Sequence, residues 1–465
     1  MITRILLLLT SLLSFLPAAC AQDVHLWLTT SHRTDLLAEQ PDALRFGAAP
    51  ATSLPVIDVN DMEQYQTMQG FGFALTGGSA QLLMAMSPAA RSKLLHELFD
   101  PAGDGLHVSY LRVSIGSSDM NDHPYSYDDL SAGQTDPQLT HFSLDIDRPT
   151  VIAALKEILA IHPHISILGS PWSPPAWMKT NDNLKGGHLR PEFYAAYAQY
   201  FVKYIQGMAA AGITVNAITV QNEPLNPKNT PSLVLFAQEE GALIAHNLGP
   251  AFAKAGIHTA IQVYDHNPDV TSYPLSILGD PQASPYVAGT AMHLYGGDAS
   301  AFSRIHDLYP NKDLFMTEQS VTESPHSDNL DIDEPEQRVV IESTRNWARN
   351  VLLWNLAADP HAGPHTNDGG CTECYGALTL DGDQVTRNVA YYVLGHASKF
   401  VPPGSVRVGS NAPEQMDNVA FRTPDGRMVL IVASTGNFPA HFIIRWHGKT
   451  VEATLPDEAV GTFVW

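Results

Sequence analysis

The sequence predicts an α/β fold: a (β/α)8 TIM barrel with a β-sandwich side domain formed by N- and C-terminal strands. Two observations predict it. Short apolar runs of strand length alternate with amphipathic stretches of helix length between residues 69 and 354, and eight such units are typical of a closed parallel barrel. From Ser405 onward, strand-length runs follow one another without helices between them, which predicts an antiparallel module.

The predicted barrel strands are apolar runs that end at turn-forming or polar residues. They are Gln69–Leu75, Ser109–Ile115, Ile165–Ser170, Ala217–Gln221, Thr259–Tyr264, Val287–His293, Leu314–Thr317 and Val351–Trp354. Amphipathic stretches between them predict helices, which include Ser87–Phe99, Arg148–Ala160, Pro191–Ala211 and Ser232–Ala255. The first of these has Ser87 in the capping position and Pro88 at the first helical position, as expected at the start of a helix.

Strand-length runs near both ends of the chain predict the sandwich. They are Val24–Thr29 and Ala51–Val59 near the N-terminus, and Asn418–Arg422, Met428–Ala433 and Phe442–Trp446 near the C-terminus. The turn signal Pro424-Asp425-Gly426 separates two of them. We therefore expect a signal peptide over residues 1–21, N-terminal sandwich strands over 22–65, the catalytic barrel over 66–394 and the C-terminal sandwich over 395–465.

The first residues of the chain have the order of a secretory signal. Arg4 precedes the apolar run Ile5–Phe15, and small residues follow it. Ala19 and Ala21 fit a small-x-small cleavage site, whereas Cys20 could instead carry a lipid anchor. Because the run is too short to span a bilayer, we expect a secreted or periplasmic protein without an integral membrane segment after processing. A lipid anchor at Cys20 is the alternative.

The charge balance excludes some partners. The chain has 26 Lys and Arg residues against 48 Asp and Glu residues, a net charge of -22. Nucleic acids and anionic membrane surfaces both attract clustered Lys and Arg, and this chain offers no basic cluster. An apolar content of 44% is enough for a large core and excludes wholesale disorder. We therefore expect a folded protein that acts on a neutral ligand and does not bind nucleic acid.

Cys371 and Cys374 are the cysteines beyond the signal, and they lie in an irregular loop rich in Gly, Asp and His. Exported proteins keep disulfides, and this loop lacks the strand-to-helix context of a redox motif. A local disulfide is the favoured interpretation. The alternative is a zinc site in which His361, His365 and the two cysteines are the four ligands.

The segment Ser324–Glu336 is polar and acidic. It could hold calcium, but it lacks the central Gly of an EF-hand loop. We expect a solvated loop rather than a metal site.

Two glutamates stand at the ends of predicted strands nearly opposite each other in the barrel. Glu223 lies in the segment Asn222-Glu223-Pro224 after the fourth strand, and Glu318 ends the seventh. An isolated Glu at a strand end often pairs with Arg or Lys, but here the Pro fixes the Glu at the rim. Active sites lie at this end of such barrels, and two facing carboxylates are what glycoside hydrolysis requires.

Further polar and aromatic residues follow the other strands. Arg112 lies on the second strand and Asp119 follows it, Trp172 follows the third, His293 and Tyr295 the sixth, and Trp354 the eighth. Aromatic faces stack on sugar rings, and short polar side chains bind hydroxyl groups. Packing in the core would be the ordinary interpretation of each tryptophan alone; their placement on one rim favours a sugar site.

The chain resembles glycoside hydrolase family 30, the glucosylceramidase family, in an ordered series of motifs from about residue 25 to Trp465. The motifs are Gln69-Gly-Phe-Gly-Phe-Ala-Leu-Thr76, Leu111-Arg-Val-Ser114, Gly169-Ser-Pro-Trp-Ser-Pro-Pro-Ala-Trp-Met-Lys179, Thr219-Val-Gln-Asn-Glu-Pro224, Ala291-Met-His-Leu-Tyr295, Leu314-Phe-Met-Thr-Glu318, Trp354-Asn-Leu-Ala357 and Gly395-His-Ala-Ser-Lys-Phe-Val-Pro-Pro-Gly404. The family's barrel and sandwich agree with the pattern above.

The resemblance implies a role for each matching residue. Glu223 would be the general acid/base and Glu318 the nucleophile of a retaining mechanism, so Glu223 is expected to be protonated and Glu318 ionised. The remaining residues would bind or orient: Asn222 the 2-hydroxyl, Asp119 and Trp172 the outer hydroxyls of a glucose-like ring, Trp354 an aromatic wall, and Arg112, His293 and Tyr295 the nucleophile or neighbouring hydroxyls.

The chain also departs from the family. Where glucosylceramidases have an acidic residue after the first-strand Thr, this chain has Thr76-Gly77-Gly78-Ser79, a form associated with bacterial members, some of which cleave β-1,6-glucan. The cysteine loop is a second departure. We expect a retaining β-glucoside hydrolase of the glucosylceramidase type, acting on a glycolipid or a β-glucan without metal or organic cofactor. An endo-acting β-1,6-glucanase is the alternative, and a non-catalytic carbohydrate-binding protein is a third.

Overall fold

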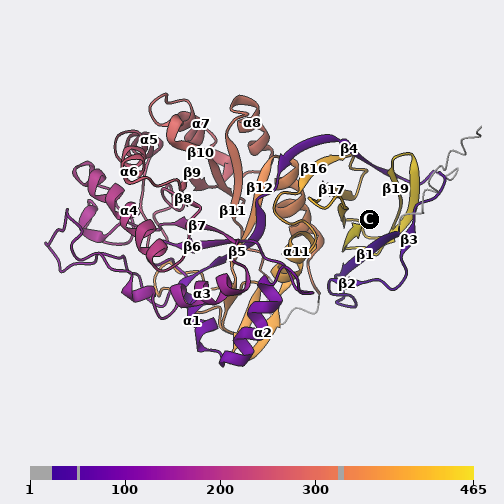
Figure 1. The fold of residues 1–465 in the computed structure, drawn as a ribbon, viewed down its shortest axis with the longest axis horizontal. Helices are drawn as coiled ribbons and strands as arrows, with labels where there is room; N and C mark the ends of the chain where they lie inside the picture. The colour runs from indigo at the N-terminus through magenta and orange to yellow at the C-terminus, as the bar shows by residue number, and fades with distance from the viewer. Residues whose placement is uncertain (1–22, 50–52, 323–328) are drawn as a thin grey trace, which may run out of the picture.

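Eight parallel strands close into a barrel in the computed structural model, which describes residues 23–49, 53–322 and 329–465 (Figure 1). The order of hydrogen-bonded neighbours around the barrel is β10-β11-β12-β5-β6-β7-β8-β9. The strands are β5 (Gly70–Leu75), β6 (Tyr110–Ser114), β7 (Ser166–Ser170), β8 (Ala217–Thr219), β9 (Ala260–His266), β10 (Val287–His293), β11 (Asp313–Glu318) and β12 (Ala348–Asn355). All eight predicted barrel strands are present, so the predicted fold class is confirmed.

Helices surround the barrel strands (Figure 1). They are α1 (Gly77–Ala85), α2 (Pro88–Phe99), α3 (Val151–Ile161), α4 (Tyr194–Ala210), α5 (Ala237–Leu243), α6 (Gly249–Ala255), α7 (Ser272–Leu278), α8 (Ser300–Leu308), α9 (Asp333–Pro335), α10 (Glu342–Arg345) and α11 (Val389–Ser398). The Ser87 side chain accepts a hydrogen bond from the Ala90 N–H and caps α2, as the sequence predicts. A small sheet of β13 (Ala357–Ala358), β14 (Leu378–Asp381) and β15 (Gln384–Arg387) follows β12.

The helix predicted over Ser232–Ala255 was wrong in its first part. The chain from Ser232 to Leu235 is a loop, because the N–H groups of Ser232, Val234 and Leu235 donate to the carbonyls of Leu184, Gly187 and Pro224 in other loops. Helical structure begins only at α5, and a π-helical turn over Ile244–Leu248 separates α5 from α6. Periodicity could not show these partners, because they come from distant loops.

Strands from both ends of the chain form the second domain. The ten strands are β1 (Asp23–Thr30), β2 (Ala38–Glu39), β3 (Leu44–Arg45), β4 (Val56–Thr67), β16 (Val406–Ser410), β17 (Met416–Arg422), β18 (Met428–Ser434), β19 (Ala440–Trp446), β20 (Lys449–Leu455) and β21 (Ala459–Val464). β1 pairs with β21 with Leu28 opposite Gly461, so the predicted joining of the two ends is confirmed. β16, β20 and β21 were not predicted.

The sheet folds over one apolar core, which makes it a sandwich. Val24 on β1, Ile57 on β4, Phe442 on β19 and Phe463 on β21 all belong to that core. In the order β2-β1-β21-β18-β17-β16-β4-β19-β20, the neighbours β1 and β21 are separated from the neighbours β4 and β19 by β18, β17 and β16. Distant strands share a core only when the sheet turns back on itself.

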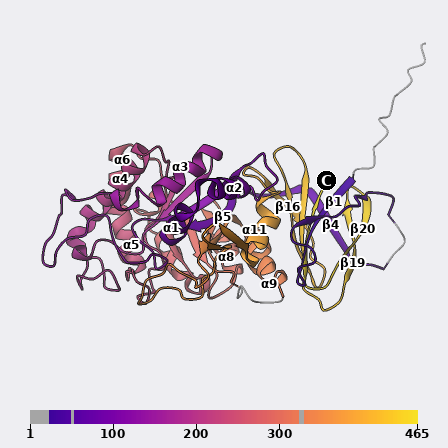
Figure 2. The ribbon, with the colours of Figure 1, turned by 90° about the horizontal axis from the view of Figure 1, so that it is seen from below.

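Helix α11 lies between the barrel and the sandwich and contacts β5 and β21 (Figures 1 and 2). Its buried His396 bonds Thr462 Oγ1 through Nδ1 at 2.9 Å and Thr29 Oγ1 through Nε2 at 2.8 Å. Burial lowers the pKa of His396 to about 3, so the ring is neutral. One side chain therefore ties the barrel to both ends of the chain. The predicted boundaries at residues 65 and 394 stay predictions, while β4 runs to Thr67 and α11 to Ser398.

The predicted signal over residues 1–21, with Cys20, lies outside the described residues, so export and a lipid anchor stay predictions. Within the described ranges, no helix has the length and apolar character needed to cross a bilayer.

Replacing His396 by Ala should destabilise the protein by about 2–4 kcal/mol, because two buried hydrogen bonds are lost and a cavity remains. Urea denaturation followed by tryptophan fluorescence measures this change. His441→Ala is the matched control, because it removes an exposed ring that bonds Thr454 on the neighbouring strand, and it should cost less than about 0.5 kcal/mol. Equal losses for the two variants would contradict a joining role for His396.

Candidate active site

The structure brings the predicted site residues together at the carboxyl end of the barrel. Each follows from the strand that carries or precedes it: Arg112 on β6, Asp119 after β6, Trp172 after β7, Asn222 and Glu223 after β8, His293 on β10, Tyr295 after β10, Glu318 on β11 and Trp354 on β12. All of them are buried except Tyr295, whose exposed fraction is 43%.

Arg112 is the central cation of the site, and its side chain is completely buried. Its guanidinium donates to a Glu318 carboxylate oxygen, to Asn222 Oδ1 at 2.7 Å and to Asp265 Oδ2 at 2.8 Å. It also lies over the ring of Trp172, 4.8 Å from the centroid. A planar guanidinium can satisfy several acceptors at once in fixed directions, so Arg112 sets the relative positions of three segments.

Glu223 has a left-handed backbone, with φ of 44°. Its N–H donates to the Asp265 carbonyl at 3.0 Å, which holds this turn after β8. Its Oε2 accepts a hydrogen bond from Asn226 Nδ2 at 2.7 Å, and its Oε1 lies 3.2 Å from His293 Nδ1. A non-Gly residue in this conformation is uncommon and often marks a functional position.

The two glutamates face each other across a short gap. Carboxylate oxygens of Glu223 and Glu318 and a ring nitrogen of His293 all lie within 4.8 Å of one another. Tyr295 donates its hydroxyl to Glu318 Oε1 at 3.1 Å. Carboxyl groups about 5–5.5 Å apart are typical of retaining glycosidases, whereas inverting enzymes leave about 6.5–9.5 Å for a water molecule. The gap here fits the retaining geometry.

Asp265 is a buried member of the site that the sequence interpretation missed. Its carboxylate binds Arg112, accepts from Thr219 and Thr317, and lies 3.1 Å from His293 Nε2. The predicted fifth strand ends at Tyr264, one residue before Asp265. An Asp directly after the apolar run was the available signal.

Burial and the neighbouring cations shift the pKa values of Glu223 and Glu318 in opposite directions. Burial alone would raise the pKa of Glu223, but the hydrogen bond and charge of His293 lower it to about 2. Burial raises the pKa of Glu318 despite His293 and Arg112. In the site without substrate, the proton expected on Glu223 therefore lies on His293, because His293 bonds Glu223 directly. The acid/base role of Glu223 and the nucleophile role of Glu318 stay predictions.

His293 holds the proton that Glu223 lacks. Burial would lower the pKa of His293, but the charge of Glu318 and the hydrogen bonds with Asp265 and Glu223 raise it to about 10. Burial would also raise the pKa of Asp265, but Arg112 and His293 keep it well below its usual range. The carboxylates of Glu223, Glu318 and Asp265 thus surround two cations, Arg112 and His293. One negative charge remains, and the two glutamates share it.

A cavity of about 190 Å³ opens onto these groups. Its lining residues are Asp119, Trp172, Glu223, Asn229, Tyr295, Glu318, Ser320, Trp354, Cys371 and Cys374. The rings of Trp172 and Trp354 lie with centroids 5.4 Å apart, and Trp172 Nε1 is buried without a partner among the described residues. A free donor beside aromatic faces suits a sugar hydroxyl.

Cys371 and Cys374 form a disulfide, so the predicted local disulfide is present and the alternative zinc site with His361 and His365 is excluded. The disulfide lines the catalytic cavity and packs with Trp172 and Trp354. The cysteine loop is therefore a wall of the site.

The Gly77-Gly78 pair leaves room for Met120 and Asn121 to lie against the start of helix α1. A Cβ atom at Gly77 would lie 1.9 Å from Asn121 Nδ2, and one at Gly78 would lie 2.6 Å from the Met120 carbonyl oxygen. Thr76 caps α1 by accepting from the Ser79 N–H. A side chain at position 77 would collide with the Asn121 amide, so the glycine allows this close approach.

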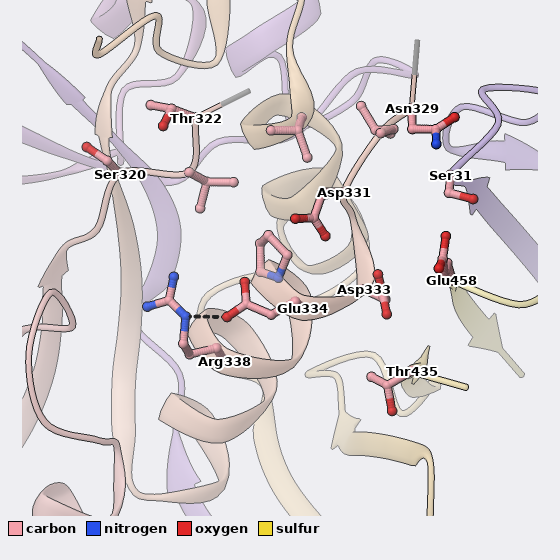
Figure 3. Close-up of a pocket in the computed structure, with 14 residues that line it drawn as sticks. Ser31, Ser320, Thr322, Asn329, Asp331, Asp333, Glu334, Arg338, Thr435 and Glu458 are labelled. Carbon is pink, nitrogen blue, oxygen red and sulfur yellow. Dashed lines mark hydrogen bonds and ion pairs between the residues drawn. The ribbon is translucent and has the colours of Figure 1, made fainter. Parts of the chain in front are cut away.

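A larger cavity of about 650 Å³ lies beyond Ser320, where the barrel meets the sandwich (Figure 3). Asp331, Asp333 and Glu458 line it, and Arg338 Nε donates to Glu334 Oε1 at 2.7 Å. This is the region predicted as a solvated loop over Ser324–Glu336, of which residues 324–328 lie outside the description. The described carboxylates of this loop do not gather in a group of three.

A (β/α)8 barrel that carries two facing, buried glutamates among aromatic walls at its carboxyl end has the architecture of a glycoside hydrolase. The chain belongs to glycosyl hydrolase family 30. The TIM-barrel domain of that family matches residues 68–401, and its beta sandwich domain matches residues 404–463. The predicted family is confirmed.

Relatives of two kinds resemble the chain over most of its length. An endo-1,6-beta-D-glucanase of Trichoderma harzianum is 35% identical, covering 89% of this chain and 87% of the relative. The lysosomal acid glucosylceramidase of Mus musculus is 29% identical, covering 87% and 82%. A solved endo-beta1,6-glucanase is 34% identical, with a TM-score of 0.87, and covers 96% of this chain and 99% of that structure.

The pH dependence of stability should report on Asp119. Burial and the charges of Glu318 and Glu223 raise the pKa of Asp119 from 3.8 to about 8. Between these values the folded protein holds a proton that the unfolded chain releases, so the free energy of unfolding falls as pH rises. The slope is at most about 1.4 kcal/mol per pH unit.

Asp119→Asn should therefore flatten the dependence of Tm on pH across this window, as measured by differential scanning fluorimetry. Asp122→Asn, at an exposed carboxylate nearby in the same loop, should follow the wild-type protein. A variant at Asp119 with the unchanged slope would refute the assignment.

Proposed function

We propose that this protein is an endo-acting β-1,6-glucanase that retains the configuration of the cleaved bond. The observation that carries the proposal is the similarity to endo-1,6-β-glucanases in sequence and structure, at 35% and 34% identity over nearly the whole chain. The mouse glucosylceramidase is more distant, at 29%. The alternative drawn from the sequence thus has better support than the glucosylceramidase type, which was the first interpretation.

The lining of the catalytic cavity supports a sugar polymer over a lipid. Among the described residues, those that line it include no Leu, Ile, Val, Met or Phe. A ceramide would need an apolar surface next to the scissile bond to leave water. The net charge of -22 also opposes approach to an anionic membrane, whereas a neutral glucan carries no such penalty.

In the first chemical step, a Glu318 oxygen attacks the anomeric carbon of the bound glucose unit. The bond from that carbon to the leaving oxygen breaks, and the leaving oxygen takes a proton from Glu223. The proton reaches Glu223 from His293, whose Nδ1 lies 3.2 Å from Glu223 Oε1. This transfer leaves a neutral imidazole and a protonated acid without any change in the total charge of the site.

In the second step, water attacks the anomeric carbon from the side of Glu223. Glu223 takes a proton from that water, the bond between Glu318 and the sugar breaks, and the Glu318 carboxylate returns to Arg112 and Tyr295. Each glutamate ends in its starting state after the proton returns to His293. Two displacements at one carbon give net retention.

The remaining residues of the cavity would hold the sugar ring. Asn222, fixed through Oδ1 by Arg112, keeps its amide donor for the 2-hydroxyl. Asp119 and the free Nε1 of Trp172 would bind the outer hydroxyls, and the Trp354 ring would cover an apolar face of the sugar. These contacts strengthen as charge develops at the anomeric carbon, which is where binding energy accelerates the reaction.

A comparison of three substrates tests the function. We expect β-1,6-glucan to be cleaved to short oligosaccharides early in the reaction, with slower hydrolysis of glucosylceramide and of a small aryl glucoside. Chromatography of the products separates endo-action from release of single glucose units. Hydrolysis of the lipid but not of the polymer would overturn the proposal in favour of a glucosylceramidase.

Glu318→Gln should reduce kcat on β-1,6-glucan by at least about a thousandfold while leaving Tm close to the wild-type value, because the nucleophile is lost and the fold is kept. Glu223→Gln should lose less activity on an aryl glucoside, whose leaving group needs little protonation. Glu452→Gln, an exposed change on β20, is the matched control. Proton NMR of the first product should show the β-anomer; the α-anomer would refute retention.

A further inference from the structure

A second group of metal-binding side chains lies in the connection between β6 and α3, outside the catalytic cavity. Ligand atoms of Asp128, Asp136 and His141 all lie within 4.8 Å of one another. Asp128 and Asp136 are buried, with exposed fractions of 1% and 6%, whereas His141 is exposed. Nothing in the proposed reaction uses these three residues.

Asp128 is the unusual member of the group. Neither of its carboxylate oxygens has a hydrogen-bond partner among the described residues, although both are inaccessible to solvent. A buried carboxylate without a partner is costly, since its charge has lost its hydration. Its position beside Asp136 and His141 means that a cation held by all three would satisfy both oxygens.

The backbone holds the Asp128 carboxylate in place. Tyr127, the preceding residue, donates its hydroxyl to Asp147 Oδ2 and stacks on Tyr204 of α4 with centroids 5.9 Å apart. The Asp128 carbonyl accepts a hydrogen bond from Trp177 Nε1 at 3.0 Å. These contacts fix the chain at residues 127 and 128, so the Asp128 side chain projects from a fixed backbone.

Asp136 and His141 lie close enough to share one ion. His141 Nδ1 is hydrogen-bonded to Asp136 Oδ2 at 2.9 Å. Two ligand atoms about 2.0–2.2 Å from a tetrahedral metal stand about 3.3–3.6 Å apart, so a shift of about half an ångström would let the pair hold the ion. Asp136 Oδ2 is fixed further by the hydroxyl of Thr140 and the N–H of His141.

The negative charges of Asp128 and Asp136 also favour a bound cation. No Lys or Arg among the described residues forms an ion pair with Asp128 or Asp136. His141 is the only neighbour of opposite charge that pairs with the group in the described part of the chain, and it does so only when protonated. Two adjacent carboxylates with so little compensation favour a bound positive ion.

We propose that Asp128, Asp136 and His141 bind a divalent transition-metal ion of the zinc class. Two carboxylates with one imidazole suit zinc better than calcium or magnesium, which prefer ligand sets made only of oxygen. The exposed side at His141 leaves room for water to complete the coordination. The ion would cross-link residue 128 to the 136–141 turn and fasten the connection that also carries Asp119.

Zinc titration of the full-length, untagged protein tests the proposal. After removal of metal with EDTA, isothermal titration calorimetry with zinc chloride should show binding to the wild-type protein. His141→Ala, an exposed change that spares the core, should weaken this binding at least about tenfold. Asp128→Asn should abolish binding at this site. Crystals soaked in zinc should show an anomalous peak between the three side chains.

Matched controls come from the same loop. Asp122 and His123 form an exposed Asp–His pair with 2.6 Å between Oδ1 and Nδ1, so Asp122→Asn and His123→Ala should titrate as the wild-type protein does. The group of Glu223, His293 and Glu318 could also take zinc, and Asp128→Asn would leave that binding unchanged. The proposal therefore predicts that Asp128→Asn binds one equivalent of zinc fewer than the wild-type protein.

Two results would overturn the proposal. One is zinc binding by Asp128→Asn and His141→Ala with the stoichiometry and affinity of the wild-type protein. The other is the absence of zinc binding together with a higher Tm for Asp128→Asn, which would identify Asp128 as a buried acid that keeps its own proton. Neither result would affect the proposed glucanase function, because the substrate test does not involve these residues.

Discussion

The buried guanidinium of Arg112 is the interaction on which the catalytic end of the barrel depends. It binds Glu318 on β11, Asn222 after β8 and Asp265 on β9, so one side chain fixes three separate segments. A lysine could not do this, because it lacks the planar set of donors. Without the guanidinium, His293 would be the remaining cation among three buried carboxylates, and burial of unpaired charge is among the largest penalties known in proteins.

The strong patterns of the sequence predicted the barrel. Its strands are continuous apolar runs because helices cover the outside and side chains fill the inside. Elements whose partners are distant were less predictable. The loop from Ser232 to Leu235 is held by other loops. Strands β16, β20 and β21 mix apolar residues with Gly, Thr or charged residues, so their pairing partners are needed to identify them.

The catalytic site, like the fold, could be predicted in part from the sequence. Position at strand ends was enough to find Glu223 and Glu318, but their charges depend on which atoms touch. His293 Nδ1 lies nearer to Glu223 than to Glu318, at 3.2 Å against 3.8 Å, and no sequence pattern gives that difference. Asp265 directly follows the predicted fifth strand, but the inward direction of its carboxylate depends on the backbone, which turns left-handed at Tyr264 and Asp265, with φ of 79° and 52°.

The substrate, too, could be predicted only in part from the sequence. The motifs that identified the family converge on the cavity at the carboxyl end of the barrel, and by themselves they do not separate its members. The two departures are the Gly77-Gly78 pair, which lets Asn121 approach helix α1, and the disulfide of Cys371 and Cys374, which lines the cavity. The effect of such loop residues on a substrate appears only when the loops are seen in space.

The pairing of β1 with β21 makes the barrel an insertion between the first and last strands of the sandwich. Leu28 and Gly461 are partners across 433 positions, 461 minus 28. At ribosomal speed that distance corresponds to a wait on the order of tens of seconds. During this interval the core that buries Leu26 and Leu28 is incomplete. The risk of aggregation therefore depends on the time that synthesis takes and not on the stability of the finished protein.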